Sequence, residues 1–126
     1  MSSPTQRTLD HWRKQGGIAA VVEKTIPYKF IKQDVWGFCD AIVCHPLWPG
    51  TVYIQTTSAQ NVNARMKKIL NTPEIAANVK RVLGAGNTVL VEGWAKRMKN
   101  KRTVGHERVA FRCVQEGEKL RFERGG

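Results

Sequence analysis

The sequence predicts an α/β fold, a single domain with a mixed central sheet flanked by helices. Its 126 residues suit one compact domain, and 41% hydrophobic with 25% charged residues is an ordinary globular composition. The apolar patterns run in the order helix, three strands, helices, strand. Three consecutive strands joined through a helical crossover to a fourth give a sheet with both antiparallel and parallel neighbours.

Helices are expected where polar caps and apolar spacing coincide. Ser3 is a suitable N-cap before Pro4, and Gly16 with Gly17 ends that first helix. Apolar residues recur at i, i+4, i+7 and i+8 from Val62, which predicts a second helix with one buried face. A third helix is expected to begin at Thr72-Pro73 and to stop at Gly84. The remaining inward positions are Leu9 and Trp12 in the first helix, Met66, Ile69 and Leu70 in the second, and Ile75, Val79 and Leu83 in the third.

Strands are expected where short β-branched runs are bounded by turn residues. The prolines and glycine of residues 45–50 predict a turn, and residues 27–34 an extended basic connection. Residues 98–106 are expected to form a hairpin loop or flap. The strands are expected at residues 18–23, 37–44, 51–57, 88–94 and 108–114, with a short edge strand at 119–124.

The charge is high and uneven. The formal net charge is +11, and residues 64–126 carry fifteen basic against six acidic side chains, whereas residues 1–63 carry six against four. Such a field attracts polyanions and releases their counterions on binding, so nucleic acid, with DNA foremost, is the expected partner. A basic surface without a specific partner, or association with the ribosome, is the alternative.

Nothing in the sequence indicates a membrane protein. No apolar run is long enough to span a bilayer, and the first residues lack the apolar core of a secretion signal. The cysteines are odd in number, and Cys39 and Cys113 fall in apolar runs typical of small buried thiols. We therefore expect a cytoplasmic protein in a reducing compartment.

Polar side chains interrupt two adjacent strands at Asp40 and Gln55. If His45 and Gly50 close a four-residue loop, paired positions sum to 95 and these two residues lie opposite each other. Two oxygen-bearing side chains so placed can share a hard divalent cation, and Glu23 and Asp34 are expected near the same corner. The alternative is structural: Asp40 caps a turn or pairs with an arginine, and Gln55 bonds to backbone.

The segments VVEK, KQDVWGFCDAIV, YIQTTS and NVNARMKKIL resemble the PD-(D/E)xK, or restriction-endonuclease-like, nuclease superfamily. The resemblance spans about Thr8 to Trp94 and is nearest to small phage and bacterial domains, distantly similar to archaeal Holliday-junction resolvases and VRR-type nucleases. It implies an αβββαβ core over about residues 5–95, followed by a basic hairpin or tail at 96–126. It further implies a DNA endonuclease dependent on Mg²⁺ or Mn²⁺, acting on branched or single-stranded DNA. A phage protein in the bacterial host cytoplasm, and a homodimer, are compatible with it.

The resemblance assigns site residues by position. Glu23 matches the first acid, Asp40 the aspartate and Gln55 the glutamate of Glu-x-Lys, and the Thr56 carbonyl would complete the metal ligands. Thr57 stands where the lysine is expected, and threonine cannot supply that positive charge.

Two interpretations of this departure stay open. A cation from the following helix, Arg65 or Lys68, replaces the lysine, or the site has decayed to a nucleic-acid-binding module. A protein-interaction factor is a third possibility.

Further cations are expected to hold the nucleic acid. The basic segment 95–112 and the strip at residues 28–32 are candidates, although such runs are often solvated loops. The expected nucleic-acid-binding residues are Lys29, Lys32, Arg65, Lys68, Lys96, Arg97, Lys99, Lys101 and Arg102. Of the tryptophans, Trp36 and Trp94 are expected in the core and Trp48 over the edge of the sheet.

Overall fold

The computed structural model describes residues 3–22, 24–26 and 31–125, with backbone alone at 24–26 and 31–32. The helices are α1 (Pro4–Lys14), α2 (Val62–Asn71) and α3 (Pro73–Gly84), with a 3₁₀ turn, η1 (Ala59–Asn61), before α2. The strands are β1 (Ile18–Val21), β2 (Lys24–Ile26), β3 (Ile31–Gln33), β4 (Ala41–Cys44), β5 (Val52–Ser58), β6 (Thr88–Lys99), β7 (Arg102–Glu116) and β8 (Lys119–Arg124).

Within the described residues the strands form a mixed sheet of six, in the order β1-β4-β5-β6-β7-β8. β5 and β6 are parallel and joined through α2 and α3, and the other neighbours are antiparallel. The predicted mixed sheet flanked by helices is confirmed, as is the edge strand at residues 119–124. β2 and β3 pair with each other in a separate two-stranded ribbon that the sequence pattern did not indicate.

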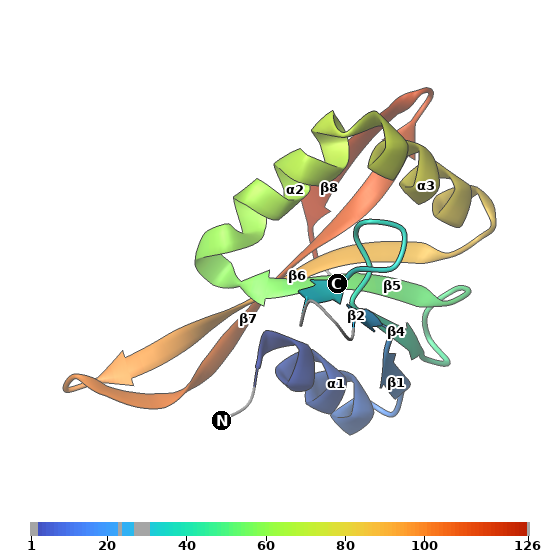
Figure 1. The fold of residues 1–126 in the computed structure, drawn as a ribbon. Helices are drawn as coiled ribbons and strands as arrows, with labels where there is room; N and C mark the ends of the chain where they lie inside the picture. Colours follow the sequence, from blue (N-terminus) through green and yellow to red (C-terminus); the bar gives the residue numbers. More distant parts are fainter. Residues whose placement is uncertain (1–2, 23, 27–30, 126) are drawn as a thin grey trace.

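The helices cover the sheet from both sides: α1 lies on one face and α2 with α3 on the other (Figure 1). The α1 face packs Trp12 against Val43, Ile54 and Leu90. The opposite face buries the inward sides of α2 and α3 with Phe38 and Cys113. This two-sided burial explains why the central strands read as nearly continuous apolar runs.

α1 begins and ends where the sequence predicts. The Ser3 hydroxyl accepts a hydrogen bond from the Gln6 N–H at 3.2 Å, and Pro4 occupies the first turn. Leu9 and Trp12 are buried, as expected. The helix therefore holds its N-terminal turn at the end of the sheet where β5 finishes, and the Thr5 hydroxyl bonds to that of Thr56 at 2.6 Å.

The second predicted sheet strand is shorter than expected. Residues 36–38 form a turn, closed by a bridge between Val35 and Cys39, and β4 begins only at Ala41. The chain turns there because Trp36 and Gly37 both have positive φ, 55° and 81°. This turn puts Trp36 at the surface with 51% of its area exposed, so its predicted core position is wrong.

β6 and β7 extend well beyond the predicted strands. They run to Lys99 and from Arg102 and form a two-stranded arm that projects from the body of the molecule (Figure 1). Positive φ at Asn100 and Lys101, 50° and 63°, is the conformation of a two-residue type I′ hairpin turn. The loop predicted at residues 98–106 is therefore wrong: most of it is paired strand.

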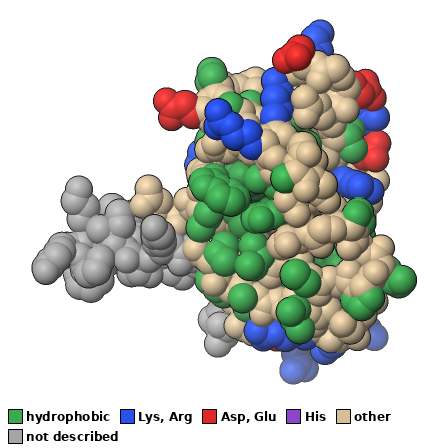
Figure 2. Space-filling view, turned by 90° about the vertical axis from the view of Figure 1, so that its right-hand side faces the viewer, with side chains coloured by type: hydrophobic (Ala, Val, Ile, Leu, Met, Phe, Trp, Pro, Cys, Tyr) green, Lys and Arg blue, Asp and Glu red, His purple; other side chains and the backbone are tan. Residues whose placement is uncertain are grey.

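The side of the molecule at the end of α3 carries hydrophobic side chains among polar ones (Figure 2). Figure 2 shows hydrophobic side chains gathered on this side. A cavity of about 430 Å³ is lined there by Trp36, Tyr53 and Val82, and the Trp36 and Tyr53 ring centroids lie 5.8 Å apart.

In the part of the chain that the structure describes, no helix is both long and apolar enough to cross a bilayer.

Candidate active site

The two polar residues singled out in adjacent strands do meet. The β4–β5 register pairs Ala41 with Ile54, so paired positions sum to 95 as the loop length predicted. Asp40 directly precedes β4, and its N–H donates to the Ile54 carbonyl at 2.9 Å. The Gln55 side-chain N–H donates to Asp40 Oδ2 at 2.7 Å. The two side chains therefore point to the same side of the sheet and touch.

Asp40 also completes the edge of β5. The Thr56 N–H donates to Asp40 Oδ2 at 2.8 Å, and the Thr56 hydroxyl donates to the same oxygen at 3.3 Å. Because β4 begins only after Asp40, no β4 backbone lies opposite Thr56, and the carboxylate takes that place. A buried backbone N–H needs a partner, so this contact stabilises the sheet independently of any ligand.

A second carboxylate lies on the other side of the Gln55 amide. Gln55 Nε2 is 3.3 Å from Asp34 Oδ2 as well as 2.7 Å from Asp40 Oδ2. Oxygens from two acidic residues thus lie within hydrogen-bonding distance of one atom. The amide N–H groups compensate two carboxylates that would otherwise repel each other.

These residues line an open pocket of about 520 Å³ at the end of the sheet. Arg65 and Lys68 enter it from α2, as their spacing predicted, and Thr5 from the first turn of α1. The acidic and amide side chains lie inside, and the two cations come from one neighbouring helix. The full lining is Pro4, Thr5, Gln33, Asp34, Gly37, Asp40, Gln55, Thr56, Arg65 and Lys68.

Other predicted site residues are not in this lining. Glu23 and Lys29 lie outside the described residues, as does the side chain of Lys32. Thr57 is buried. Among the residues that the structure describes, no group of three or more His, Cys, Asp or Glu side chains could hold a metal ion. The pocket offers two carboxylates and an amide.

Five of the fifteen basic residues of the second half lie on the arm. They are exposed and do not line the pocket, although Lys96, at the base of the arm, lines a neighbouring groove. The arm residues predicted to bind nucleic acid are Lys96, Arg97, Lys99, Lys101 and Arg102.

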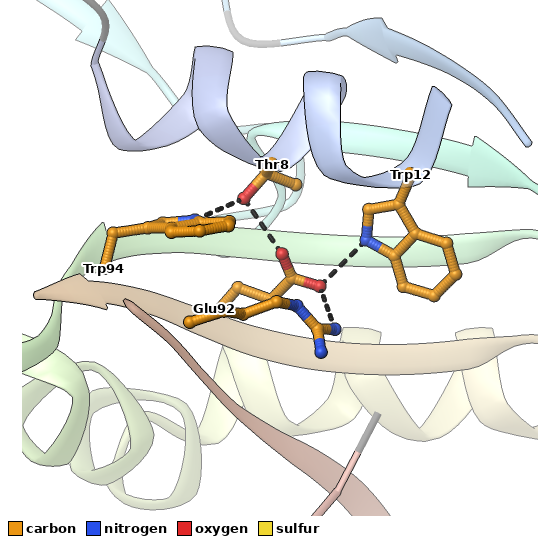
Figure 3. Close-up of polar contacts among 5 residues, drawn as sticks. Thr8, Trp12, Glu92 and Trp94 are labelled. Atoms are coloured by element: carbon orange, nitrogen blue, oxygen red, sulfur yellow. Dashed lines mark hydrogen bonds and ion pairs between the residues drawn. The ribbon is translucent and has the colours of Figure 1, made fainter. Parts of the chain in front are cut away.

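A third carboxylate, Glu92 in β6, was missed by the sequence interpretation. It is fully buried and accepts hydrogen bonds from the Thr8 hydroxyl at 2.9 Å, the Trp12 indole N–H at 2.8 Å and the Arg108 guanidinium at 2.6 Å (Figure 3). The Trp94 indole N–H donates in turn to Thr8 at 3.0 Å. Glu92 interrupts an apolar strand just as Asp40 does, so the same signal was available.

The Glu92 cluster anchors α1 to the sheet, because Thr8 and Trp12 belong to α1 and Arg108 to β7. His11 lies beside it. Burial and the nearby charge of Arg108 lower the pKa of His11, and Glu92 opposes them. Every carboxylate oxygen of Glu92 has a protein donor, which marks a structural role.

The thiol beside the pocket is inert. Burial is the main cause that raises the pKa of Cys39 to about 12, so it carries no thiolate near neutral pH. Cys113 behaves alike, and both are buried as predicted. The chemistry of the pocket therefore rests on carboxylates, the amide, hydroxyls and two cations.

Comparison with known proteins found no relative: no family model matches the chain, and no curated protein or solved structure is significantly similar to it.

Proposed function

We propose that this protein binds nucleic acid and hydrolyses its phosphodiester bonds in the pocket of Asp34, Asp40 and Gln55, with the help of a divalent cation. The observation that carries the proposal is the convergence of two carboxylates and an amide in an open pocket whose remaining charged groups, Arg65 and Lys68, are cationic. The restriction-endonuclease-like superfamily resemblance, with its αβββαβ core, is part of the same proposal.

The donor set suits a hard cation such as Mg²⁺ or Mn²⁺. A half-turn of the Gln55 amide exchanges its NH₂ group for the carbonyl oxygen, which would then lie beside oxygens of both Asp34 and Asp40. Three oxygen donors from three side chains are what such a cation prefers, and without one they repel each other. The amide orientation is therefore expected to depend on whether the cation is bound. The Thr56 carbonyl and Glu23 remain further candidate ligands.

When bound, the cation would supply a water of lowered pKa and neutralise charge on the phosphate. Asp34, Asp40 and Gln55 would hold it. Arg65 and Lys68 bind the phosphate oxygens and stabilise the charge that develops on them in the transition state. Lys68 supplies the positive charge that Thr57, being uncharged and buried, cannot supply.

The test is cleavage of single-stranded, duplex and branched DNA with Mg²⁺ or Mn²⁺ by the parent and by Asp40→Asn. Asparagine can place its one carbonyl oxygen where Oδ2 accepts hydrogen bonds from the Gln55 amide, the Thr56 N–H and the Thr56 hydroxyl, so the fold should survive. We expect cleavage by the parent, none by Asp40→Asn, and parental cleavage by the exposed control Glu118→Gln. No cleavage by pure parent with either ion refutes the proposal, as does equal cleavage by Asp40→Asn.

A second candidate function is nucleic-acid binding without catalysis. It is favoured by the hydrogen bonds that already satisfy one Asp40 oxygen and by the neutral amide in place of a third acid. The exposed cations of the arm would then carry the function, since a two-stranded ribbon fits the major groove of duplex DNA.

This candidate predicts binding in EDTA that weakens steeply with salt. Charge reversal at Lys99, Lys101 or Arg102 should each lower the affinity and reduce the salt slope by about one. Lys119→Glu, an exposed lysine in β8, is the matched control. Affinity independent of salt removes this candidate.

A further inference from the structure

Next to the active-site pocket lies a second groove, of about 410 Å³, in whose lining there is no acidic residue. Pro4 lines both concavities, so they adjoin at the first turn of α1. The groove is bordered by α1, by the turn after β5 and by the base of the arm. Its lining is Pro4, Arg7, Ser58, Ala59, Gln60, Trp94, Ala95, Lys96 and His106.

Three basic side chains from three elements meet in this groove. Arg7 comes from α1, and Lys96 and His106 face each other across the β6–β7 pair. Burial, then the positive charges of Arg7 and Lys96, lower the pKa of His106, which agrees with their closeness. Positive groups crowded in a concavity without an acid are the ordinary protein environment of an anion.

One donor of the Arg7 guanidinium, the Nε–H, has no hydrogen-bond partner among the described residues. This Nε–H is buried and donates to no acceptor there. Arginines in folded proteins usually satisfy their donors with carboxylates, carbonyls or phosphates. The same side chain also lines a smaller adjoining cavity of about 330 Å³, together with Trp94 and His106, and Asp10 is the acid in that lining. Arg7 therefore stands where two concavities join.

We infer that this groove binds a backbone phosphate of the nucleic acid, next to the phosphate at the active-site pocket, through Arg7, Lys96 and His106. The inference rests on the proposed nucleic-acid binding, and it adds Arg7 and His106 to the contacts. The strand then runs from the pocket past the N-terminal turn of α1 to the base of the arm. Trp94 forms a fixed wall of this path, since its indole N–H is held by Thr8.

The experiment measures oligonucleotide binding in EDTA, so it does not depend on hydrolysis. A fluorescent oligothymidylate and a fluorescent duplex are titrated with the parent, Arg7→Gln and Lys96→Gln. Arg13→Gln, on the same helix but outside the groove, and Lys119→Gln are the matched controls. We expect each groove variant to weaken binding roughly tenfold, the loss of one charge-assisted hydrogen bond, and the controls to bind as the parent does.

The two oligonucleotides separate the possible sources of the phosphate. If the groove holds a single strand, the groove variants lose affinity for the oligothymidylate. If it holds a duplex, they lose affinity for the duplex. A loss with either supports the inference. Parental affinity of Arg7→Gln and Lys96→Gln for both would overturn it, whether or not the parent cleaves DNA. If the groove variants bind more weakly as expected but the parent does not cleave DNA, the result counts against the proposed catalysis alone.

A second readout is specific to the groove. The pKa of His106, followed by NMR, should rise when the oligonucleotide that binds is added, because a phosphate stabilises the imidazolium. The effect should vanish in Arg7→Gln if Arg7 helps to hold that phosphate. An unchanged pKa of His106 in a saturated complex would contradict the placement of the phosphate.

Discussion

Replacement of Glu92 by alanine tests how α1 is held on the sheet. Glu92 is fully buried, and its carboxylate accepts from Thr8, Trp12 and Arg108 at 2.6–2.9 Å. Alanine removes the acceptor for all three donors at once. The Trp12 indole N–H is buried and cannot turn to water, so its desolvation is no longer compensated.

The expected loss of stability follows from the burial of the Glu92–Arg108 ion pair. Loss of one partner of a buried ion pair costs roughly 3–5 kcal/mol, out of a total stability of about 5–15 kcal/mol for a domain. Glu92→Gln should cost less, about 1.5–3 kcal/mol, the range for one hydrogen bond to a charged group. Its carbonyl oxygen can still accept from Trp12 and Arg108, and its NH₂ group can donate to the Thr8 hydroxyl.

Urea unfolding followed by tryptophan fluorescence measures both variants, since Trp12 and Trp94 belong to the cluster. With an m-value of about 2 kcal/mol/M, Glu92→Ala should unfold about 2 M earlier than the parent. Glu107→Ala, which removes an exposed carboxylate from β7, is the control and should change little. A midpoint for Glu92→Ala within experimental error of the control would refute the anchoring role.

Two further predictions concern titratable groups. Burial raises the pKa of Cys39 and of Cys113 to about 12. Iodoacetamide at pH 8 should therefore modify the exposed Cys44 in the native protein and all three thiols in urea. Fast labelling of more than one thiol in the native protein, measured by mass spectrometry, would contradict this. The pKa of His11 is lowered below 6.5 by burial and by Arg108, so the unfolded chain binds this proton more readily and the free energy of unfolding should fall as the pH drops below 6.5. Urea melts at a series of pH values should show a smaller fall in His11→Gln, and an unchanged fall would assign it to other groups.

The features that sequence predicted well are those fixed by local chemistry. The turn at residues 45–50 sets the β4–β5 register, and the register alone places Asp40 opposite Gln55. In α2, a spacing of three residues puts Arg65 and Lys68 on one face, which the fold then turns toward the pocket. No knowledge of distant contacts is needed for either.

The features that sequence missed depend on contacts between distant segments or on exposed backbone. The outer halves of β6 and β7 lack an apolar face, so their alternation gave no strand signal, although each pairs with the other. Trp36 is carried to the surface by a left-handed backbone that its residue type does not indicate. Glu92 was visible as an acid in an apolar strand, but its partners in α1, Thr8 and Trp12, are 84 and 80 residues away in the chain.

The proposed function depends on whether the side chains around Gln55 bind a divalent cation, which Mn²⁺ titration by calorimetry or electron paramagnetic resonance measures. We expect saturable binding of Mn²⁺ by the parent, loss of that binding in Asp40→Asn, and tighter binding in Gln55→Glu, where a full charge replaces the amide. Parental binding in Asp40→Asn, or no saturable binding by the parent, would contradict it.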